Sequence, residues 1–206
     1  MPRIQPKNTW LLAVSGGVAA VLVIAVVSLT GIHSPLNGVI RLGALLGYLA
    51  VFLASLSSNY MRELTRFFGR AFVKVHHVIS VTALVALTLH AVAVAWQAQS
   101  LAAFLPDFSS WRMFLTLGGR PAFWLIAITS VTALLRTSIG DNWKVIHWLN
   151  YVAFFLGTVH GWLIGSTFDQ LLIVRIVSLA MAAALVVVFA ARRLAEYRRK
   201  QRRQRA

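Results

Sequence analysis

The segment Trp143–Gly161, WKVIHWLNYVAFFLGTVHG, decides the fold of this chain. It is an apolar run with the length of a membrane span, and it carries two histidines thirteen residues apart. A second run, Val75–Ala91 (VHHVISVTALVALTLHA), repeats the arrangement with a spacing of fourteen. Ionisable side chains are rare inside membrane spans, because hydrocarbon does not solvate them, and they usually mark a functional site. The four histidines that form the two pairs are His76, His90, His147 and His160.

The composition indicates an integral membrane protein. Of 206 residues, 59% are hydrophobic and 12% are charged, whereas a soluble domain has about 25% charged residues. The chain has no cysteine, which excludes disulfides, thiolate metal sites and iron–sulfur ligation.

The net charge of +15 is concentrated at the C-terminus, where eight of the twenty Lys and Arg residues lie between Arg192 and Arg205. A basic tail beside a membrane span most often sets the topology and contacts anionic membrane lipid. Docking of an acidic cytoplasmic partner is the alternative interpretation. In a membrane protein we expect no nucleic-acid partner from this charge.

Hydrophobic runs predict six membrane-spanning helices. The first has about twenty apolar residues, enough to cross a ~30 Å hydrocarbon core at 1.5 Å per residue. It is too long for a signal peptide, so we expect an uncleaved span. The predicted spans are residues 10–30, 38–57, 73–96, 120–135, 144–164 and 171–191.

The distribution of basic residues predicts the orientation of these spans. Sixteen of the twenty Lys and Arg residues fall in the termini and in the second and fourth loops, and basic residues accumulate on the cytoplasmic side. Only helices or closed barrels satisfy their backbone in lipid. We therefore predict an all-α polytopic membrane protein, a six-helix bundle with both termini cytoplasmic. Its parts are a cytoplasmic N-terminus (1–9), the transmembrane domain (10–191) and a basic cytoplasmic tail (192–206).

In this topology the third and fifth spans run in the same direction, and the four histidines fall at two levels. His76 and His147 lie near the cytoplasmic ends, and His90 and His160 lie about 21 and 20 Å further out. Each level can clamp one haem iron through two imidazoles. Two axial histidines leave iron no open position, so such a cofactor tends to carry electrons. We predict two b-type haems, an inner one between His76 and His147 and an outer one between His90 and His160.

Helical phase places the two histidines on one helix face in the third span but not in the fifth. A spacing of fourteen residues rotates the helix by about −40°, which keeps both histidines on one face. A spacing of thirteen leaves the two histidines of the fifth span about 140° apart, so we expect a bulge, an underwound turn or a strong tilt there. Gly157 is a candidate position for this distortion. His77 is the alternative inner ligand, and the competing interpretation is that all these histidines merely pack in the bundle.

The other charged residues complete the set of candidates. All five acidic residues lie in predicted loops or in the tail, so no carboxylate relay of the kind a proton-coupled transporter needs is visible at membrane depth. Haem propionates, or a cytoplasmic flavin, would need cationic partners. The candidates are Arg70 and Lys74 at the inner level and Arg120 and Arg175 at the outer level; snorkelling to the interface explains them equally well.

These residues resemble those of the ferric-reductase-like transmembrane cytochromes over about residues 38–190. That family includes ferric reductases, the membrane halves of NADPH oxidases, and MsrQ (YedZ), the haem subunit of the bacterial periplasmic methionine sulfoxide reductase system. Its pattern is a six-span core with paired histidines, thirteen or fourteen residues apart, on the third and fifth spans. The features similar to MsrQ are Arg120-Pro121 and the pattern Gly140-x-x-Trp143-x-x-x-His147-x-x-x-Tyr151.

The resemblance implies an electron-transfer subunit of an oxidoreductase in a prokaryotic inner membrane. The sequence has no Gly-rich dinucleotide fingerprint, so electrons are expected from a separate cytoplasmic flavin reductase, a bound FMN or FAD, or membrane quinol. The MsrQ likeness implies a periplasmic molybdenum-containing methionine sulfoxide reductase as acceptor. One alternative is terminal reduction of ferric chelates or oxygen at the outer haem. Another, of a different class, is a haem-free transporter or structural membrane protein.

Overall fold

The computed structural model describes residues 10–68 and 72–205, and every regular element in these ranges is helical. The all-α prediction is therefore confirmed for the described residues. The long helices are α1 (Trp10–Leu29), α2 (Pro35–Ser58), α4 (Phe72–Ala98), α6 (Gly119–Leu134), α9 (Leu149–Ile164) and α11 (Leu172–Arg205). The short helices are α3 (Met61–Phe68), α5 (Trp111–Thr116), α7 (Arg136–Ile139), α8 (Trp143–His147) and α10 (Ser166–Gln170), with 3₁₀ turns η1 (Leu101–Phe104) and η2 (Gly140–Asn142).

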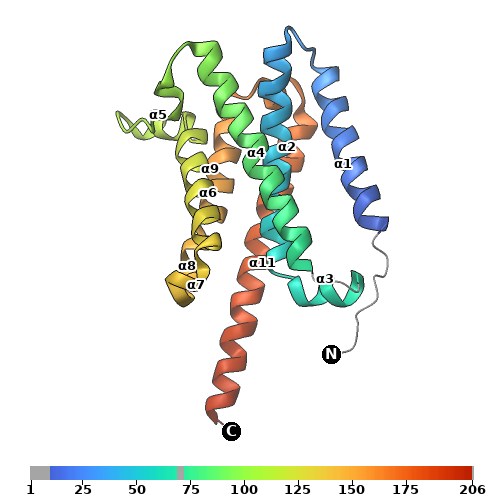
Figure 1. Cartoon of the computed structure of the whole chain (residues 1–206), viewed down its shortest axis with the longest axis vertical. Coiled ribbons are helices and arrows are strands. Elements are labelled where there is room, and N and C mark those ends of the chain that lie inside the picture. The colour runs from blue at the N-terminus through green and yellow to red at the C-terminus, as the bar shows by residue number, and fades with distance from the viewer. Residues whose placement is uncertain (1–9, 69–71, 206) are drawn as a thin grey trace.

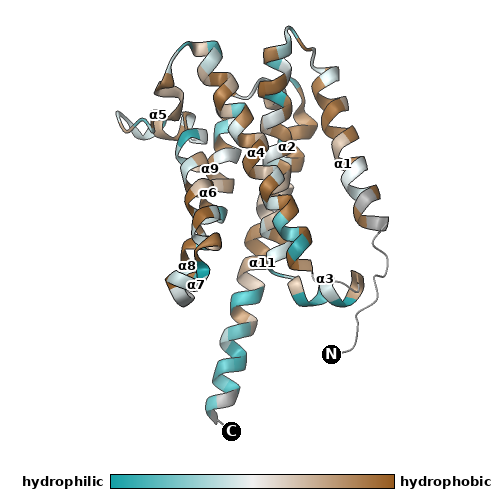
Figure 2. Cartoon of the chain, viewed as in Figure 1, coloured by the Kyte–Doolittle hydropathy of each residue, from teal (hydrophilic) through white to brown (hydrophobic). Residues whose placement is uncertain are grey.

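The long helices run side by side along one axis, and the short helices α3, α5, α7 and α8 lie at the ends of the bundle (Figure 1). The first turn of α1 and the last turn of α11 lie towards the same end. Figure 2 shows apolar residues along the long helices and hydrophilic residues along the distal part of α11. Many large apolar side chains on the outer faces are exposed, as expected for helices that contact lipid.

Among the described residues, three helices are long and apolar enough to cross a membrane: α2, α4 and α11 over Leu172–Arg202. Two apolar stretches are shorter, namely Val14–Leu29 of α1 and the whole of α6. These helices indicate an integral membrane protein. The count of six spans and the cytoplasmic location of the termini stay predictions.

Helices α2 and α4 approach each other closely because α2 carries glycine where the two backbones meet. A Cβ atom at Gly43 would lie 2.8 Å from the carbonyl oxygen of Ala86, and one at Gly47 would lie 2.6 Å from Cγ of Leu87. Small residues four apart allow such contacts between membrane helices. The buried apolar core beside this contact consists of Ala50, Val51, Ala83, Ala122, Ile126, Ala153, Phe154, Ala182 and Leu185.

The fifth predicted span is interrupted at Trp148, between α8 and α9. The N–H of Trp148 donates to the Val145 carbonyl at 3.1 Å and the N–H of Tyr151 donates to the Trp148 carbonyl at 3.0 Å, which are i to i+3 bonds. Such tight turns advance about 120° per residue instead of 100°, and this extra rotation reduces the phase difference between the two histidines. The fifth span is therefore distorted, but the turn is overwound and not underwound as expected, and it lies at Trp148 and not near Gly157, where α9 is continuous.

Two further elements differ from the sequence prediction. The basic loop after the second span contains the short helix α3. The sixth predicted span, expected to end at Ala191, continues as one unbroken helix to Arg205. The residues beyond Ala191 are strong helix formers, mostly Arg, Ala, Leu, Glu, Lys and Gln, so nothing in the sequence stops the helix at the membrane surface.

Candidate functional site

The inner level brings His76 of α4 and His147 of α8 together. Their ring centroids are 6.3 Å apart, with 63° between the ring planes. Because a metal–imidazole bond is about 2 Å long, two imidazoles on opposite sides of one metal ion have centroids roughly 6 Å apart. His76 is buried, with 8% of its surface exposed. The separation of the two rings therefore suits a shared metal ion.

The inner rings have longer side-chain contacts, and each also has a backbone partner, Ala54 for His76 and Thr129 for His147. Nδ1 of His76 lies 3.4 Å from Oγ of Ser57, and Nδ1 of His147 lies 3.4 Å from the amide nitrogen of Asn150. The other atom of that amide accepts a hydrogen bond of 2.7 Å from Thr129 Oγ1. The alternative ligand of the sequence analysis, His77, is exposed on α4. The structure thus places His76, and not its neighbour, against His147.

The outer level is anchored by the backbone. Nδ1 of His90 lies 2.8 Å from the carbonyl oxygen of Ile40 on α2, and Nδ1 of His160 lies 2.8 Å from the carbonyl oxygen of Thr116 at the end of α5. A carbonyl only accepts, so in both rings Nδ1 carries the hydrogen and Nε2 keeps its lone pair. This is the arrangement by which proteins orient histidines that bind metals.

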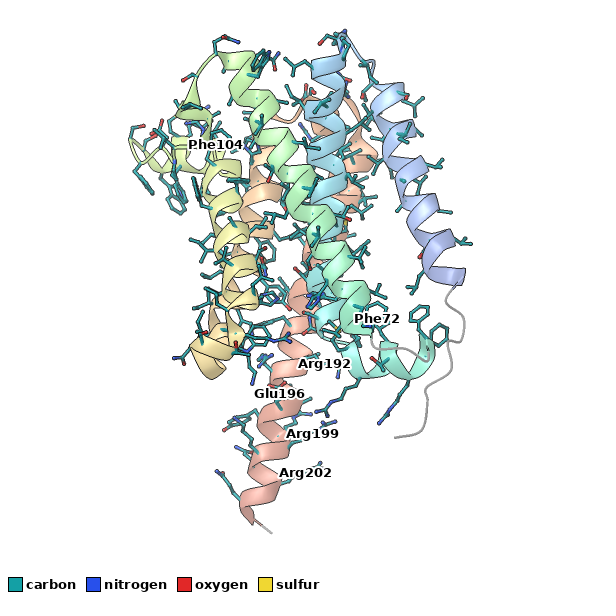
Figure 3. All side chains as sticks on the ribbon, in the orientation of Figure 1. Phe72, Phe104, Arg192, Glu196, Arg199 and Arg202 are labelled. Carbon is teal, nitrogen blue, oxygen red and sulfur yellow. The ribbon has the colours of Figure 1, made fainter. Side chains whose placement is uncertain are left out.

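A cavity of about 320 Å³ lies between α2, α4, α6 and α9, and both outer histidines line it. Glycine is needed on one wall: a Cβ atom at Gly119 would lie 2.9 Å from Cδ2 and Nε2 of His160, so that ring packs directly on the α6 backbone. Phe104 of η1 also lines the cavity, towards the end of the bundle opposite Phe72 (Figure 3). The outer histidines therefore share one mostly apolar chamber.

Arg41 is a site residue that the sequence analysis did not select. It lines the same cavity, only 5% of its surface is exposed, and its guanidinium donates to Oγ1 of Thr167 at 2.9 and 3.1 Å. It also donates to the carbonyl oxygens of Thr30 and Gly31. The signal was present in the sequence, because an arginine inside a predicted span is costly unless it has a function.

The four predicted cationic residues are placed differently from one another. Arg120 lines the cavity and donates to the Leu105 carbonyl at 3.0 Å. Arg175 forms a 3.1 Å ion pair with Asp169 and is not among the cavity-lining residues. Lys74 is exposed near the start of α4, two residues before His76. Arg70 lies outside the described residues.

Over the described part of the chain, no group of three or more histidine, aspartate or glutamate side chains is placed to hold a metal ion. Each histidine pair supplies two ligands. A porphyrin iron carries four nitrogen ligands of its own and needs two more, which is the number that a histidine pair provides. The two imidazoles of each pair, and the Nε2 lone pairs of the outer pair, therefore fit a haem.

Comparison with known proteins gives one match. The family described as "Ferric reductase like transmembrane component" matches residues 15–158, which include His76, His90 and His147 and end two residues before His160. Searches of curated proteins and of solved structures found no match. Since the match covers more than half of the chain, the protein belongs to the ferric reductase-like transmembrane family.

Proposed function

We propose that this protein is a six-span b-type cytochrome that holds two haems and carries electrons out of the cytoplasm. The observation that supports this most is the outer pair, in which His90 and His160 each donate Nδ1–H to a backbone carbonyl, which leaves the lone pair on Nε2, and both residues line one cavity. A haem bound by two imidazoles supplies one-electron transfer without an open position for a substrate.

The protein's own residues orient and insulate the two sites. The carbonyls of Ile40 and Thr116 fix the ring orientation and tautomer of the outer histidines. Arg41 and Arg120 present positive charge at the outer cavity, where a carboxylate such as a haem propionate would be stabilised. The long helices that carry the two levels are apolar over most of their length (Figure 2), so the path between the levels would lie within an insulating layer.

The direction and partners follow from the predicted topology. With both termini in the cytoplasm, electrons would enter at the His76/His147 level from a flavin reductase that uses FMN or FAD, or from quinol. They would leave at the His90/His160 level for an acceptor outside the cell membrane. The likeness to MsrQ favours a periplasmic molybdenum-containing methionine sulfoxide reductase as that acceptor.

Haem content and the reduced-minus-oxidised spectrum of the purified protein test this proposal. We expect two haems per chain with bis-imidazole b-type bands. His90→Leu and His160→Leu should each remove the outer haem and leave about one per chain. The matched control is His33→Leu, because His33 is an exposed histidine in the turn between α1 and α2. A colourless protein from haem-replete cells would overturn the proposal in favour of a haem-free transporter or structural protein.

A second measurement separates the electron carrier from a terminal reductase. The chemically reduced protein is mixed with ferric citrate or with oxygen in the absence of any partner. An electron carrier should reoxidise slowly and without a saturable dependence on either acceptor. Rapid, saturable formation of ferrous iron or superoxide would instead assign the reaction to the outer site itself.

A further inference from the structure

The C-terminal part of α11 projects beyond the helix bundle as a straight extension (Figures 1 and 3). The helix has two parts. Residues 172–191 are apolar and, at 1.5 Å per residue, span about 30 Å, the thickness of the hydrocarbon core. From Arg192 onward the helix is basic, with one acidic residue, Glu196. The basic residues whose side chains the structure describes are Arg192, Arg193, Arg198, Arg199, Lys200 and Arg202.

The base of this extension is fastened to the bundle on two sides. Arg192 donates to Glu63 of α3 at 2.8 Å, and its guanidinium lies 4.4 Å from the ring centroid of Tyr60. Arg193 lies 4.7 Å from the ring centroid of Trp148, the residue that directly follows the inner ligand His147. These contacts fasten the base of the extension to the bundle, and one of them is with the residue that directly follows His147.

Beyond this base the positive charges have no acidic partner in the described part of the chain. Arg198, Arg199, Lys200 and Arg202 are exposed, and none forms an ion pair among the described residues. By contrast, Arg193 pairs with Glu196 at 2.8 Å. The distal residues therefore form an unneutralised basic face.

The position of this basic face favours a soluble partner over membrane lipid. Arg198 and Arg202 lie six and ten residues beyond Arg192, or about 9 and 15 Å further along the helix axis. The attraction of a charged membrane surface decays within a Debye length of about 8 Å at physiological ionic strength. A basic helix that binds lipid lies in the plane of the interface, whereas α11 continues along the axis of its apolar part.

We propose that residues 198–202 of α11 are the docking face for a soluble redox protein with an acidic surface, which would deliver electrons to a haem held by the inner histidine pair. This inference rests on the proposed electron-transfer function. Complementary charge raises the encounter rate and orients the partner. In each encounter the donor loses one electron and the inner site gains one, with no bond formed or broken.

Binding is tested with the full-length protein in nanodiscs of neutral phosphatidylcholine, with fluorescently labelled flavodoxin, a small acidic flavoprotein, as the probe. At about 20 mM salt, where screening is weak, Arg198→Gln/Arg199→Gln/Arg202→Gln should weaken binding at least about tenfold. The control Arg62→Gln/Arg66→Gln/Arg136→Gln removes the same charge from exposed residues at the same end of the bundle and should stay within about twofold. Equal losses in the two variants would overturn the inference.

Electron delivery is measured separately by stopped-flow absorbance. Reduced flavodoxin should reduce the variant Arg198→Gln/Arg199→Gln/Arg202→Gln at least about tenfold more slowly than the wild-type protein. Photoreduced riboflavin, which has no acidic protein surface, should reduce both proteins at the same rate. Equal rates with flavodoxin would overturn the inference. Absence of any haem signal would defeat the proposed function, and the binding experiment would still report on docking.

A third measurement addresses lipid as the competing occupant. In nanodiscs that contain anionic phosphatidylglycerol, measured at about 150 mM salt where the Debye length is about 8 Å, the flavodoxin affinity of the wild-type protein should stay within about twofold of its value in neutral lipid at the same salt, because the distal residues lie beyond the reach of the head groups. A loss of affinity of about tenfold would show that lipid sequesters the tail, and the basic face would then be a membrane contact.

Discussion

At the outer level both imidazoles donate Nδ1–H to backbone carbonyls at 2.8 Å, whereas at the inner level the same nitrogens lie 3.4 Å from the side chains of Ser57 and Asn150. A carbonyl in a packed helix has almost no freedom, but serine and asparagine side chains change rotamer at small cost. The outer pair is therefore held by short contacts to fixed carbonyls, whereas the inner pair combines longer side-chain contacts with backbone contacts to Ala54 and Thr129. We expect the outer site to retain its metal group more firmly.

Arg41 offers the strongest way to disturb the outer level. Arg41→Met removes the guanidinium that joins Thr167 of α10 to the carbonyls of Thr30 and Gly31, and leaves buried acceptors without a donor. We expect a loss of stability of about 3 kcal/mol, measured by thermal unfolding in detergent. Arg175→Met, which breaks an exposed ion pair, should cost about 0.5 kcal/mol or less. Comparable effects of the two substitutions would contradict the view that Arg41 braces the outer cavity.

The contact between Gly119 and His160 provides the next test. Gly119→Ala places a Cβ 2.9 Å from the imidazole, so the ring must move away from the orientation that the Thr116 carbonyl imposes. We expect a cost of about 2 kcal/mol and loss of most of the outer haem, with the inner haem retained, as read from haem content and spectrum. Gly17→Ala is the control, because a Cβ there meets nothing within 4 Å. Full occupancy of the outer haem in Gly119→Ala would show that the His160 ring has room to shift.

Asn150→Ala tests the inner level. The substitution removes the amide beside His147 and leaves the buried Thr129 hydroxyl without its 2.7 Å acceptor. We expect about 1 kcal/mol of destabilisation and a change confined to the inner haem, seen as a shifted midpoint potential or reduced occupancy in a redox titration. The control Asn142→Ala, at an exposed asparagine of η2, should change neither the stability nor the inner haem. Equal perturbation of both haems by Asn150→Ala would remove the distinction between the two levels.

The smallest expected effect concerns the base of the C-terminal helix. The hydrogen bond from Arg192 holds the pKa of Glu63 below its usual value, with weaker contributions from its own backbone and from the charge of Arg66. A lowered folded-state pKa means that this contact stabilises the fold above the ordinary glutamate pKa and is lost as pH falls through the lowered value. The arrangement of α3 and α11 should therefore be insensitive to pH near neutrality and loosen only in acid.

Spin labels measure this directly, because the chain has no cysteine of its own and labels are introduced by Arg66→Cys and Arg199→Cys. The distance distribution between them should broaden only below the usual glutamate range. In the Glu63→Gln background it should be broad at every pH. A narrow distribution in acid would mean that the contacts of Arg192 with Tyr60 and of Arg193 with Trp148 hold the helix without Glu63.

Much of the architecture could be predicted because it depends on local pattern. Hydrophobic runs locate all six long helices to within a few residues, except that α11 continues past Ala191 and the fifth run breaks at Trp148. The pairing of His76 with His147 was predicted from equal depth along two helices, and the two rings are adjacent in the structure. The Gly43-x-x-x-Gly47 contact between α2 and α4 was also readable in the sequence but was missed.

The sequence by itself determined the helical class, the apolar lengths, the two histidine levels and the basic end, because each depends on residue type and spacing along one helix. Only the tertiary structure decided which atoms hold the outer histidines, since the carbonyls of Ile40 and Thr116 lie 50 and 44 residues away in the chain. It also placed Arg41 in the cavity and left Arg175 with Asp169. Contacts between distant segments depend on how helices rotate and pack against one another, and no periodicity within a single helix encodes that rotation.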